Sequence, residues 1–142
     1  MRFKLEDDIL HVIYDNLSEI KEFEEMANEY EGEMKGRVGF NFPVTNLKKV
    51  TNLKKEMMSA KYVIVYKKGD VATKQHELQH AKYYLDSSFQ EHVKQLWNSL
   101  HVKSQTTVRG MLTKMGYSEH VMLDEFQAYF FTERPNFFGR LS

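Results

Sequence analysis

Three parts of the chain carry the apolar pattern of β-strands. The stretch from Phe3 to Tyr14, with apolar residues at Phe3, Leu5, Ile9, Val12 and Tyr14, predicts a strand or a short hairpin that turns at Asp7-Asp8. The run Lys61–Lys67 is β-branched and aromatic almost throughout, which is typical of a strand buried on both faces. A further extended segment is expected over Gly39–Val44, where it would form an edge of the sheet.

Elsewhere apolar residues recur every three or four positions, which is the period of an amphipathic helix. The first such segment covers about residues 17–34 and begins at a capping box formed by Asn16 and Glu19. A short helix is expected where the sequence TNLKK repeats, with Leu47 and Met57 at the two ends of its apolar stripe. Four more helices are expected over residues 73–85, 87–100, 104–116 and 120–133.

The ends of the later helices are marked by residues that favour caps. Asp86 or Ser87 can cap the helix over 87–100, Gly116 ends the next one, and Pro135 follows the last. No linker rich in Gly, Ser or Pro divides the 142 residues. The sequence therefore predicts a single α+β domain over residues 1–142, with an N-terminal sheet and a helical C-terminal half.

Composition narrows the possible chemistry. The chain has no cysteine, which excludes disulfides, thiolate zinc fingers, iron–sulfur clusters and a cysteine nucleophile. The N-terminus does not resemble a signal peptide and no apolar run could span a membrane, so we expect an intracellular, cytoplasmic protein without a membrane partner. Residues 1–36 hold eleven acidic and four basic residues, whereas residues 43–82 hold nine lysines and three acidic residues. Such charge runs are typical of solvated helix faces, and without an arginine-rich stripe no nucleic-acid partner is expected.

The segment QHELQHAKYYLD, residues 75–86, places two histidines and a glutamate on one predicted helix. Residues four apart lie on the same helix face, so His76 and His80 can direct their imidazoles at one metal ion, with Glu77 beside them. Two imidazoles suit Zn²⁺, and a neighbouring carboxylate can take the proton of a metal-bound water. The alternative is an ordinary amphipathic helix whose histidines bind nothing.

A third ligand is available in the segment DEFQAYFF, residues 124–131. Its Glu125 lies off the apolar stripe of the last predicted helix, and Ala128 is small enough to let a neighbouring helix approach. The motif HExxH followed by a glutamate in an (N/D)ExxA setting resembles the gluzincin zinc metallopeptidases, and the short chain is similar to their minimal members, the minigluzincins. The resemblance covers two helices. It implies that His76, His80 and Glu125 bind one Zn²⁺ and that Glu77 is the general base.

Other residues compete with Glu125 for the role of third ligand. Forty-four residues separate Glu125 from His80, a longer interval than in the better-known gluzincins. Asp86 stands six residues after His80, where metzincin-like peptidases carry a ligand, but Tyr83 replaces the glycine that lets their chain turn back. An N-cap explains Asp86 better. His92 and His120 have no supporting pattern.

Three further side chains are candidates for supporting roles. Asp124 can accept a hydrogen bond from a ligand histidine, or it can be a surface cap. Tyr129, on the face of Glu125, and Tyr84, on the face of His80, can stabilise the oxyanion of a tetrahedral intermediate. Packing in the core is the alternative for both tyrosines.

The resemblance implies a small zincin-like fold with a mixed sheet, in which a peptide or an unfolded protein lies extended along an edge strand, here Gly39–Val44. The tail over residues 134–142 is expected to cover the cleft. Two alternatives stand beside a zinc peptidase: a catalytically silent binding or regulatory module of the same fold, and a DNA-associated protease that holds nucleic acid with its lysine-rich segment. Glu77 favours hydrolysis, because a purely structural metal site does not need a general base.

Overall fold

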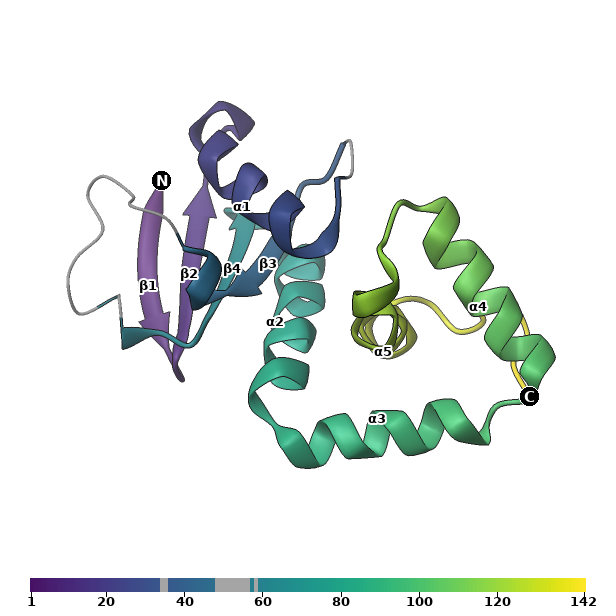
Figure 1. The fold of residues 1–142 in the computed structure, drawn as a ribbon. Helices are drawn as coiled ribbons and strands as arrows, with labels where there is room; N and C mark the ends of the chain where they lie inside the picture. The colour runs from purple at the N-terminus through teal and green to yellow at the C-terminus, as the bar shows by residue number, and fades with distance from the viewer. Residues whose placement is uncertain (34–35, 48–56, 58) are drawn as a thin grey trace.

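A four-stranded sheet and five α-helices make up the described part of the chain in a computed structural model, which covers residues 1–33, 36–47, 57 and 59–142 (Figure 1). The strands are β1 (Arg2–Glu6), β2 (Ile9–Tyr14), β3 (Phe40–Pro43) and β4 (Tyr62–Lys67). The helices are α1 (Lys21–Glu31), α2 (Val71–Leu85), α3 (Ser87–Ser99), α4 (Val102–Lys114) and α5 (Met122–Thr132). The predicted α+β class is confirmed. The helix expected at the TNLKK repeat lies largely outside the described residues.

The sheet is mixed and has the strand order β1-β2-β4-β3. Strands β1 and β2 form the predicted antiparallel hairpin, β2 and β4 run parallel, and β3 pairs antiparallel to β4. Asp7 and Asp8 turn the hairpin with φ angles of 52° and 66°. Two successive positive φ angles are the requirement of a tight hairpin turn, and aspartate tolerates them better than most residues. Strand β3 is left at an edge of the sheet, as predicted.

Side chains of alternate strand residues divide the sheet between two helices. On one face, Leu10 and Val12 of β2 pack with Phe23 and Met26 of α1. On the other face, a cluster of Ile9, Ile13, Tyr62, Ile64 and Tyr66 packs against Ala81 and Leu78 of α2. Both faces of the two central strands are therefore covered, which explains their continuous apolar sequences.

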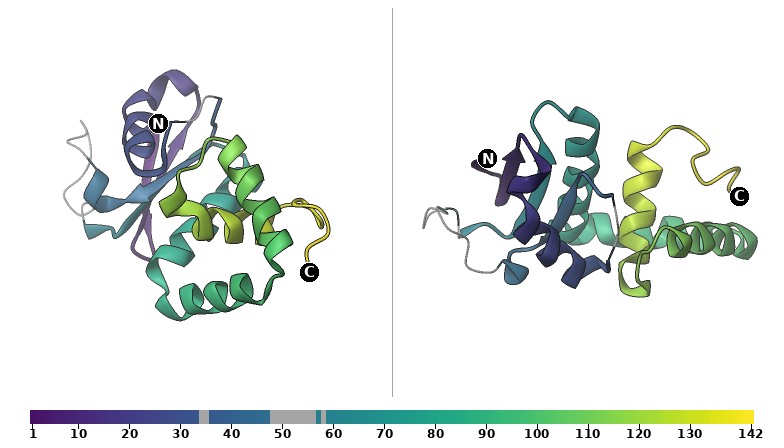
Figure 2. Two further views of the ribbon diagram at one scale, coloured as in Figure 1. Left: turned by 45° about the vertical axis from the view of Figure 1, so that its right-hand side comes forward. Right: turned by 90° about the horizontal axis from the view of Figure 1, so that it is seen from above.

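A separate core holds the helices of the C-terminal half together. Its buried members come from α3, α4, the segment between α4 and α5, α5 itself and the last residues of the chain: Val93, Trp97, Val108, Leu112, Tyr117, Val121, Met122, Phe126 and Phe138. Helix α2 extends beside the sheet and contacts α5 as well, so it belongs to both halves of the molecule (Figures 1 and 2).

The tail after α5 packs on this second core. Phe137 stacks on Tyr129 with ring centroids 5.0 Å apart, and Phe138 is buried beside Phe126. The C-terminal residue closes the contact, because the Ser142 amide donates to Ser104 Oγ (3.0 Å) and the Ser142 carbonyl accepts from the His101 amide (2.6 Å).

The helices differ from the predicted ones mainly at their starts. The segment expected as one helix over 17–34 begins with a short 3-10 turn, Leu17–Glu19, and Ile20 interrupts it before α1. The expected capping pair acts on this turn, where Glu19 Oε1 accepts from the Asn16 amide at 2.8 Å. Another 3-10 turn, Glu119–Val121, precedes α5. Gly116, with φ 104°, follows the end of α4 as expected.

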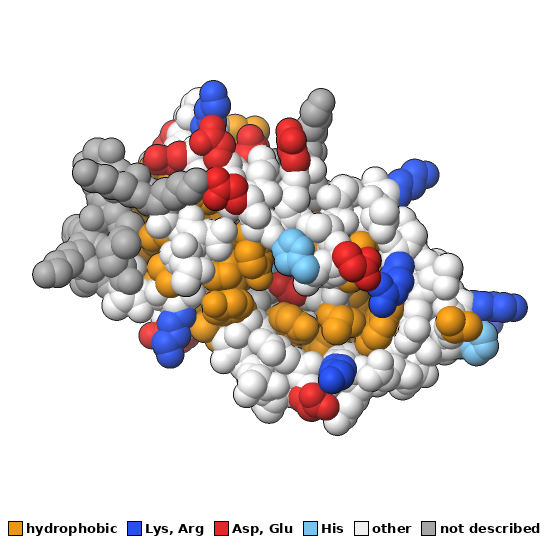
Figure 3. Space-filling view, in the orientation of Figure 1, with side chains coloured by type: hydrophobic (Ala, Val, Ile, Leu, Met, Phe, Trp, Pro, Cys, Tyr) orange, Lys and Arg blue, Asp and Glu red, His pale blue; other side chains and the backbone are white. Residues whose placement is uncertain are grey.

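Several acidic side chains of the N-terminal region gather on one surface. Figure 3 shows them over α1, which carries Glu22, Glu25 and Glu29 on its exposed side. In the described residues, no helix combines the length and apolar character needed to cross a membrane.

We predict that Phe126→Ala lowers the free energy of unfolding by about 3–5 kcal/mol, because it removes a fully buried ring that contacts Trp97 and Phe138. Phe131→Ala, a matched change at a ring that is 45% exposed, should cost less than about 1 kcal/mol. Urea unfolding followed by circular dichroism measures both. Equal losses in the two variants would contradict the described core.

Candidate metal centre

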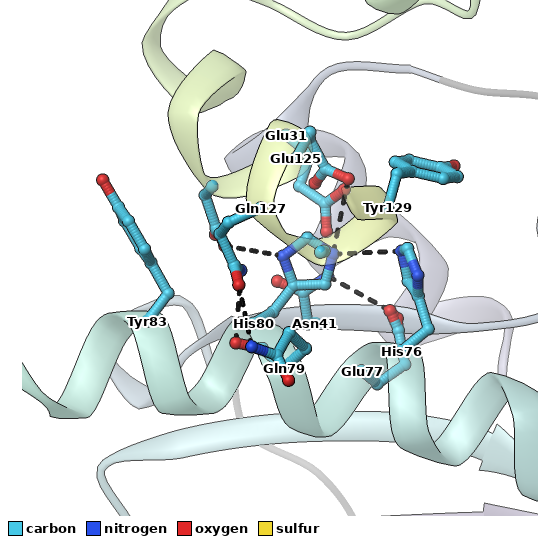
Figure 4. A network of polar contacts seen from close by, with 12 residues as sticks. Glu31, Asn41, His76, Glu77, Gln79, His80, Tyr83, Glu125, Gln127 and Tyr129 are labelled. Carbon is cyan, nitrogen blue, oxygen red and sulfur yellow. Dashed lines mark hydrogen bonds and ion pairs between the residues drawn. The ribbon is translucent and has the colours of Figure 1, made fainter. Parts of the chain in front are cut away.

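The predicted histidine helix is α2, and its first turn is held by Asp70. The Asp70 carboxylate accepts hydrogen bonds from the Thr73 amide (3.1 Å) and the Thr73 hydroxyl (2.6 Å). The apolar side of the helix, including Leu78 and Ala81, rests on the sheet. Its other side carries His76, Glu77 and His80 towards α5 and β3 (Figure 4).

His76 is held in one tautomer by α5. Its Nδ1 lies 2.9 Å from Thr132 Oγ1, and the single hydroxyl proton of Thr132 is donated to the Ala128 carbonyl at 2.6 Å. The Thr132 oxygen must therefore accept a proton from His76 Nδ1. His76 Nε2 is left without a proton, and it faces His80 Nε2 at 3.3 Å.

His80 is fixed by two neighbouring residues of α5. Its Nδ1 lies 2.8 Å from Asp124 Oδ1, and its Nε2 lies 3.3 Å from Glu125 Oε1. His80, Asp124 and Glu125 are all buried, and beyond this contact with His80 no hydrogen bond to Glu125 Oε1 is found among the described residues. The predicted partners Asp124 and Glu125 are thus both brought to the histidine pair.

The charges around His80 favour a cation at its Nε2. Burial alone lowers the pKa of His80, but the carboxylates of Asp124 and Glu125 outweigh burial and raise this pKa well above its usual value. Burial, and to a lesser extent the charge of His80, lowers the pKa of His76 to about 3, so His76 stays neutral. The site next to His76 Nε2, His80 Nε2 and Glu125 Oε1 therefore needs one positive charge, which either a proton or a metal ion can supply.

Glu77 completes a group that can hold a metal ion. The nitrogen atoms of His76 and His80 and a carboxylate oxygen of Glu77 lie within 4.8 Å of one another. Glu77 is buried, and burial raises its pKa to about 7, although His80 acts in the opposite direction. A carboxylate with this pKa can accept and release a proton near neutral pH.

Asn41 of the edge strand connects Glu77 to the sheet. The Tyr62 hydroxyl donates to Asn41 Oδ1 at 2.5 Å, so the amide group of Asn41 is oriented with its nitrogen towards Glu77. Asn41 Nδ2 donates to Glu77 Oε1 at 3.3 Å. All three side chains are buried. This chain of hydrogen bonds holds the glutamate from the side opposite to α5.

Gly39 allows the edge strand to approach α2 closely. A Cβ atom at this position would lie 2.4 Å from Thr73 Cγ2 and 3.3 Å from the carboxyl carbon of Glu77. Cβ atoms in proteins essentially never come within 3.0 Å of a heavy atom outside their own residue and its chain neighbours. The absence of a side chain at residue 39 is therefore required for the observed position of β3 over the glutamate.

His76, Glu77 and His80 line a cleft of about 290 Å³ together with Gly39 and Asn41, whereas the buried Asp124 and Glu125 are not among its described lining residues. Tyr129 lines it as well: its ring centroid lies 4.6 Å from that of His76, and its hydroxyl lies 2.8 Å from the hydroxyl of Tyr117. Tyr117 also lines the cleft, and the sequence did not predict it as a site residue. Tyr84 lies outside the cleft, 40% exposed, with its ring against Tyr62.

Two residues that line the cleft, Arg37 and Glu31, form a buried ion pair. Arg37 donates to Glu31 Oε2 at 2.9 Å and to Asn28 Oδ1 at 2.7 Å, which ties the segment before β3 to the end of α1. Burial, followed by the charge of Glu125, raises the pKa of Glu31 well above its usual value. The Glu31 carbonyl accepts from the Ser118 hydroxyl at 2.7 Å, so the end of α1 is joined to the C-terminal half.

A glutamine pair locks α2 to α5 next to the histidines. Gln79 Nε2 donates to Gln127 Oε1 at 3.0 Å, and Gln127 Nε2 donates to the Gln79 carbonyl (3.2 Å) and to Asp124 Oδ1 (3.0 Å). Gln127 is fully buried. Asp124, which already accepts from His80, is thereby fixed on both sides.

The competing ligands lie elsewhere. Asp86 caps α3 by accepting from the amides of Ser88 and Phe89, both at 3.1 Å, as the N-cap interpretation predicted. His120 contacts the Tyr30 carbonyl at 2.7 Å, and His92 is exposed on α3. None of the described lining residues of the cleft comes from the tail over 134–142, which packs on the second core.

Sequence patterns gave no signal for Asn41, Tyr117, Glu31 or Arg37. A period of two does place Asn41 on the face opposite to Phe40 and Phe42. Only the strand order shows that this face meets Glu77. Comparison of the chain with models of known families, with curated proteins and with solved structures gave no match.

We predict that Gly39→Ala lowers the free energy of unfolding by about 1–3 kcal/mol, because the new methyl group overlaps the methyl of Thr73. Thr73 cannot simply rotate, since its hydroxyl is bonded to Asp70. Thr73→Ser removes the methyl and keeps the hydroxyl, so Gly39→Ala with Thr73→Ser should recover much of the loss. Urea unfolding of the single and double variants measures this. If the change in the free energy of unfolding of the double variant equals the sum of the changes in the two single variants, the proposed contact is refuted.

Proposed function

We propose that the protein is a zinc-dependent peptidase in which His76, His80 and Glu125 bind one Zn²⁺ and Glu77 is the general base. The observation that carries the proposal is the meeting of two imidazole nitrogens and a buried carboxylate oxygen whose one close contact is the His80 Nε2 atom, in a place that requires a positive charge. Buried polar groups without partners are rare and point to a missing ligand.

The spacing and chemistry of these atoms fit zinc. Two Zn²⁺ ligands in tetrahedral geometry lie about 3.3 Å apart, given bond lengths of about 2.0–2.1 Å. His80 Nε2 lies at 3.3 Å from both His76 Nε2 and Glu125 Oε1. Two imidazoles with one carboxylate are a donor set that leaves a position for water. The other ring nitrogens donate to Asp124 and to Thr132, which is the usual support of ligand histidines.

When bound, Zn²⁺ would supply Lewis acidity and make a bound water acidic enough to act as a nucleophile near neutral pH. Glu77 is placed beside this position, and Asn41 holds its Oε1. Its raised pKa suits it to take a proton from the water and to pass it to the leaving amine. Glu77 is thus better suited to transferring a proton than to serving as a carboxylate that stays ionised throughout.

The tyrosine pair and the edge strand would act on the substrate. Burial raises the pKa of Tyr129 to about 12, so its hydroxyl stays protonated and can donate to a carbonyl oxygen that becomes negative. Strand β3 pairs with β4 along one edge. Its other edge borders the cleft and can accept an extended peptide by strand addition. This arrangement supports an unfolded protein or a peptide as the substrate class.

We predict that the purified protein binds one equivalent of zinc and that Glu125→Gln weakens binding by at least about 100-fold, because the amide replaces a charged ligand. Asp124→Asn should weaken binding by about 10- to 100-fold through its loss of support for His80. Glu133→Gln, a matched change at an exposed residue of the cleft, should have no effect. Competition with a fluorescent zinc chelator measures all three. Unchanged affinity in Glu125→Gln would remove Glu125 from the ligand set.

We also predict that the zinc-loaded protein cleaves unfolded casein and that Glu77→Gln lowers kcat by about 10²- to 10⁴-fold while zinc remains bound, because the general base is lost. Glu91→Gln on α3 provides a matched control far from the cleft. Gel electrophoresis and metal analysis of the same samples give the two readouts. Stoichiometric zinc without any cleavage by the wild-type protein would instead favour a binding module.

A further inference from the structure

A second cavity lies on the other side of the first turns of α2 and shares no lining residue with the metal cleft. Its volume is about 200 Å³, and it is enclosed by β1, the end of β4 and the start of α2. Four of its lining residues are basic: Arg2, Lys4, Lys68 and Lys74. They come from three separate parts of the sequence, so no single charge run produces the group.

The pairing of the strands brings these cations together. Side chains alternate along β1, and since Phe3 packs on Phe23 on the α1 side, Arg2 and Lys4 project from the α2 side. Arg2 pairs with Ile13, which in turn pairs with Tyr66 of β4. The cations of β1 therefore stand beside the tyrosine at the floor of the cavity.

The floor itself is well fixed. Tyr66 is only 5% exposed, and its hydroxyl lies 2.8 Å from Nδ1 of the buried His11. The Lys74 ammonium group lies 5.9 Å from the centre of the Tyr66 ring, which directs this lysine over the cavity. A buried ring with a held hydroxyl and a cation above it gives the cavity a defined shape.

The protein compensates the positive charge of the cavity only in part. Asp70 is its one acidic lining residue, and its carboxylate already accepts from Thr73. Lys4 is paired with Glu6 at 2.7 Å. None of the ion pairs found among the described residues includes Arg2, Lys68 or Lys74. Three cations without an ion-pair partner thus border one open cavity with a single lining carboxylate, so an excess of positive charge remains there that a bound anion would offset.

We propose that this cavity binds the phosphoryl group of a phosphate or phosphomonoester. A single carboxylate would neutralise one cation, whereas a phosphoryl dianion carries close to two charges and offers three oxygens to separate donors. The guanidinium of Arg2 matches two of these oxygens, and the lysines serve as point charges. The adjoining N-terminus of α2 adds a favourable dipole. This site does not depend on the proposed peptidase activity.

The test uses the full chain with inorganic phosphate as the probe. Phosphate should raise the melting temperature of the wild-type protein more than sodium chloride of equal ionic strength does, and amide signals of residues 66–74 should shift during an NMR titration. Lys68→Gln combined with Lys74→Gln should weaken phosphate binding at least about tenfold, because two charge-assisted contacts are removed. Lys94→Gln combined with Lys103→Gln, which changes the same charge at exposed positions of α3 and α4, should leave binding unchanged.

Vesicles that contain phosphatidate form a second arm, which separates a lipid headgroup from a free phosphate. If the wild-type protein binds phosphate or the vesicles and the Lys68/Lys74 variant does not, the site is supported. The arm in which binding is seen then tells whether the phosphoryl group belongs to a free phosphate or to a lipid headgroup. Equal phosphate effects in the two double variants, or no effect beyond that of chloride in the wild type, would overturn the proposal. Zinc affinity should be the same in all variants, so a failure of this site is distinguishable from a failure of the metal centre.

Discussion

The contact between α2 and α5 is polar at its centre, although both helices are otherwise packed through apolar residues. His80 meets Asp124 and Glu125 there, and all three side chains are buried. Buried carboxylates are costly unless a positive charge neutralises them. A helix pair built only for stability would place leucine or alanine at these positions. The charge requirement at His80 therefore determines the chemistry that this part of the molecule can support.

The rest of the fold keeps these groups in place. Helix α2 is pinned to the sheet through Ala81 and to α5 through the Gln79–Gln127 pair, so its functional face has little freedom to rotate. Asn41 and Gly39 act from the opposite side, one by a hydrogen bond to Glu77 and the other by its lack of a side chain. Glu77, which belongs to α2, is consequently held in place by a strand from a distant part of the sequence.

Local patterns were sufficient for the elements and for the histidine helix, because periodicity, caps and turn residues act within a few positions. The Asp7-Asp8 hairpin, the strand over Lys61–Lys67 and the cap at Asp86 are confirmed for this reason. Residues whose role depends on strand order, such as Asn41 and Arg37, could not be found in this way. The packing of the tail could not be found in this way either: its phenylalanines indicate burial, but only the packed structure shows that Phe137 and Phe138 bury against α5.

The position of Glu125 also ties function to stability. His76 and His80 lie on the helix that packs on the sheet, whereas Glu125 lies on a helix of the second core. A metal ion held by all three would link the two halves of the chain across the cleft. A ligand that binds only the folded state stabilises it by an amount that grows with its concentration above Kd. In the proposed enzyme, metal binding would therefore assemble the active site and strengthen the α2–α5 contact in a single event, without any disulfide to join the halves.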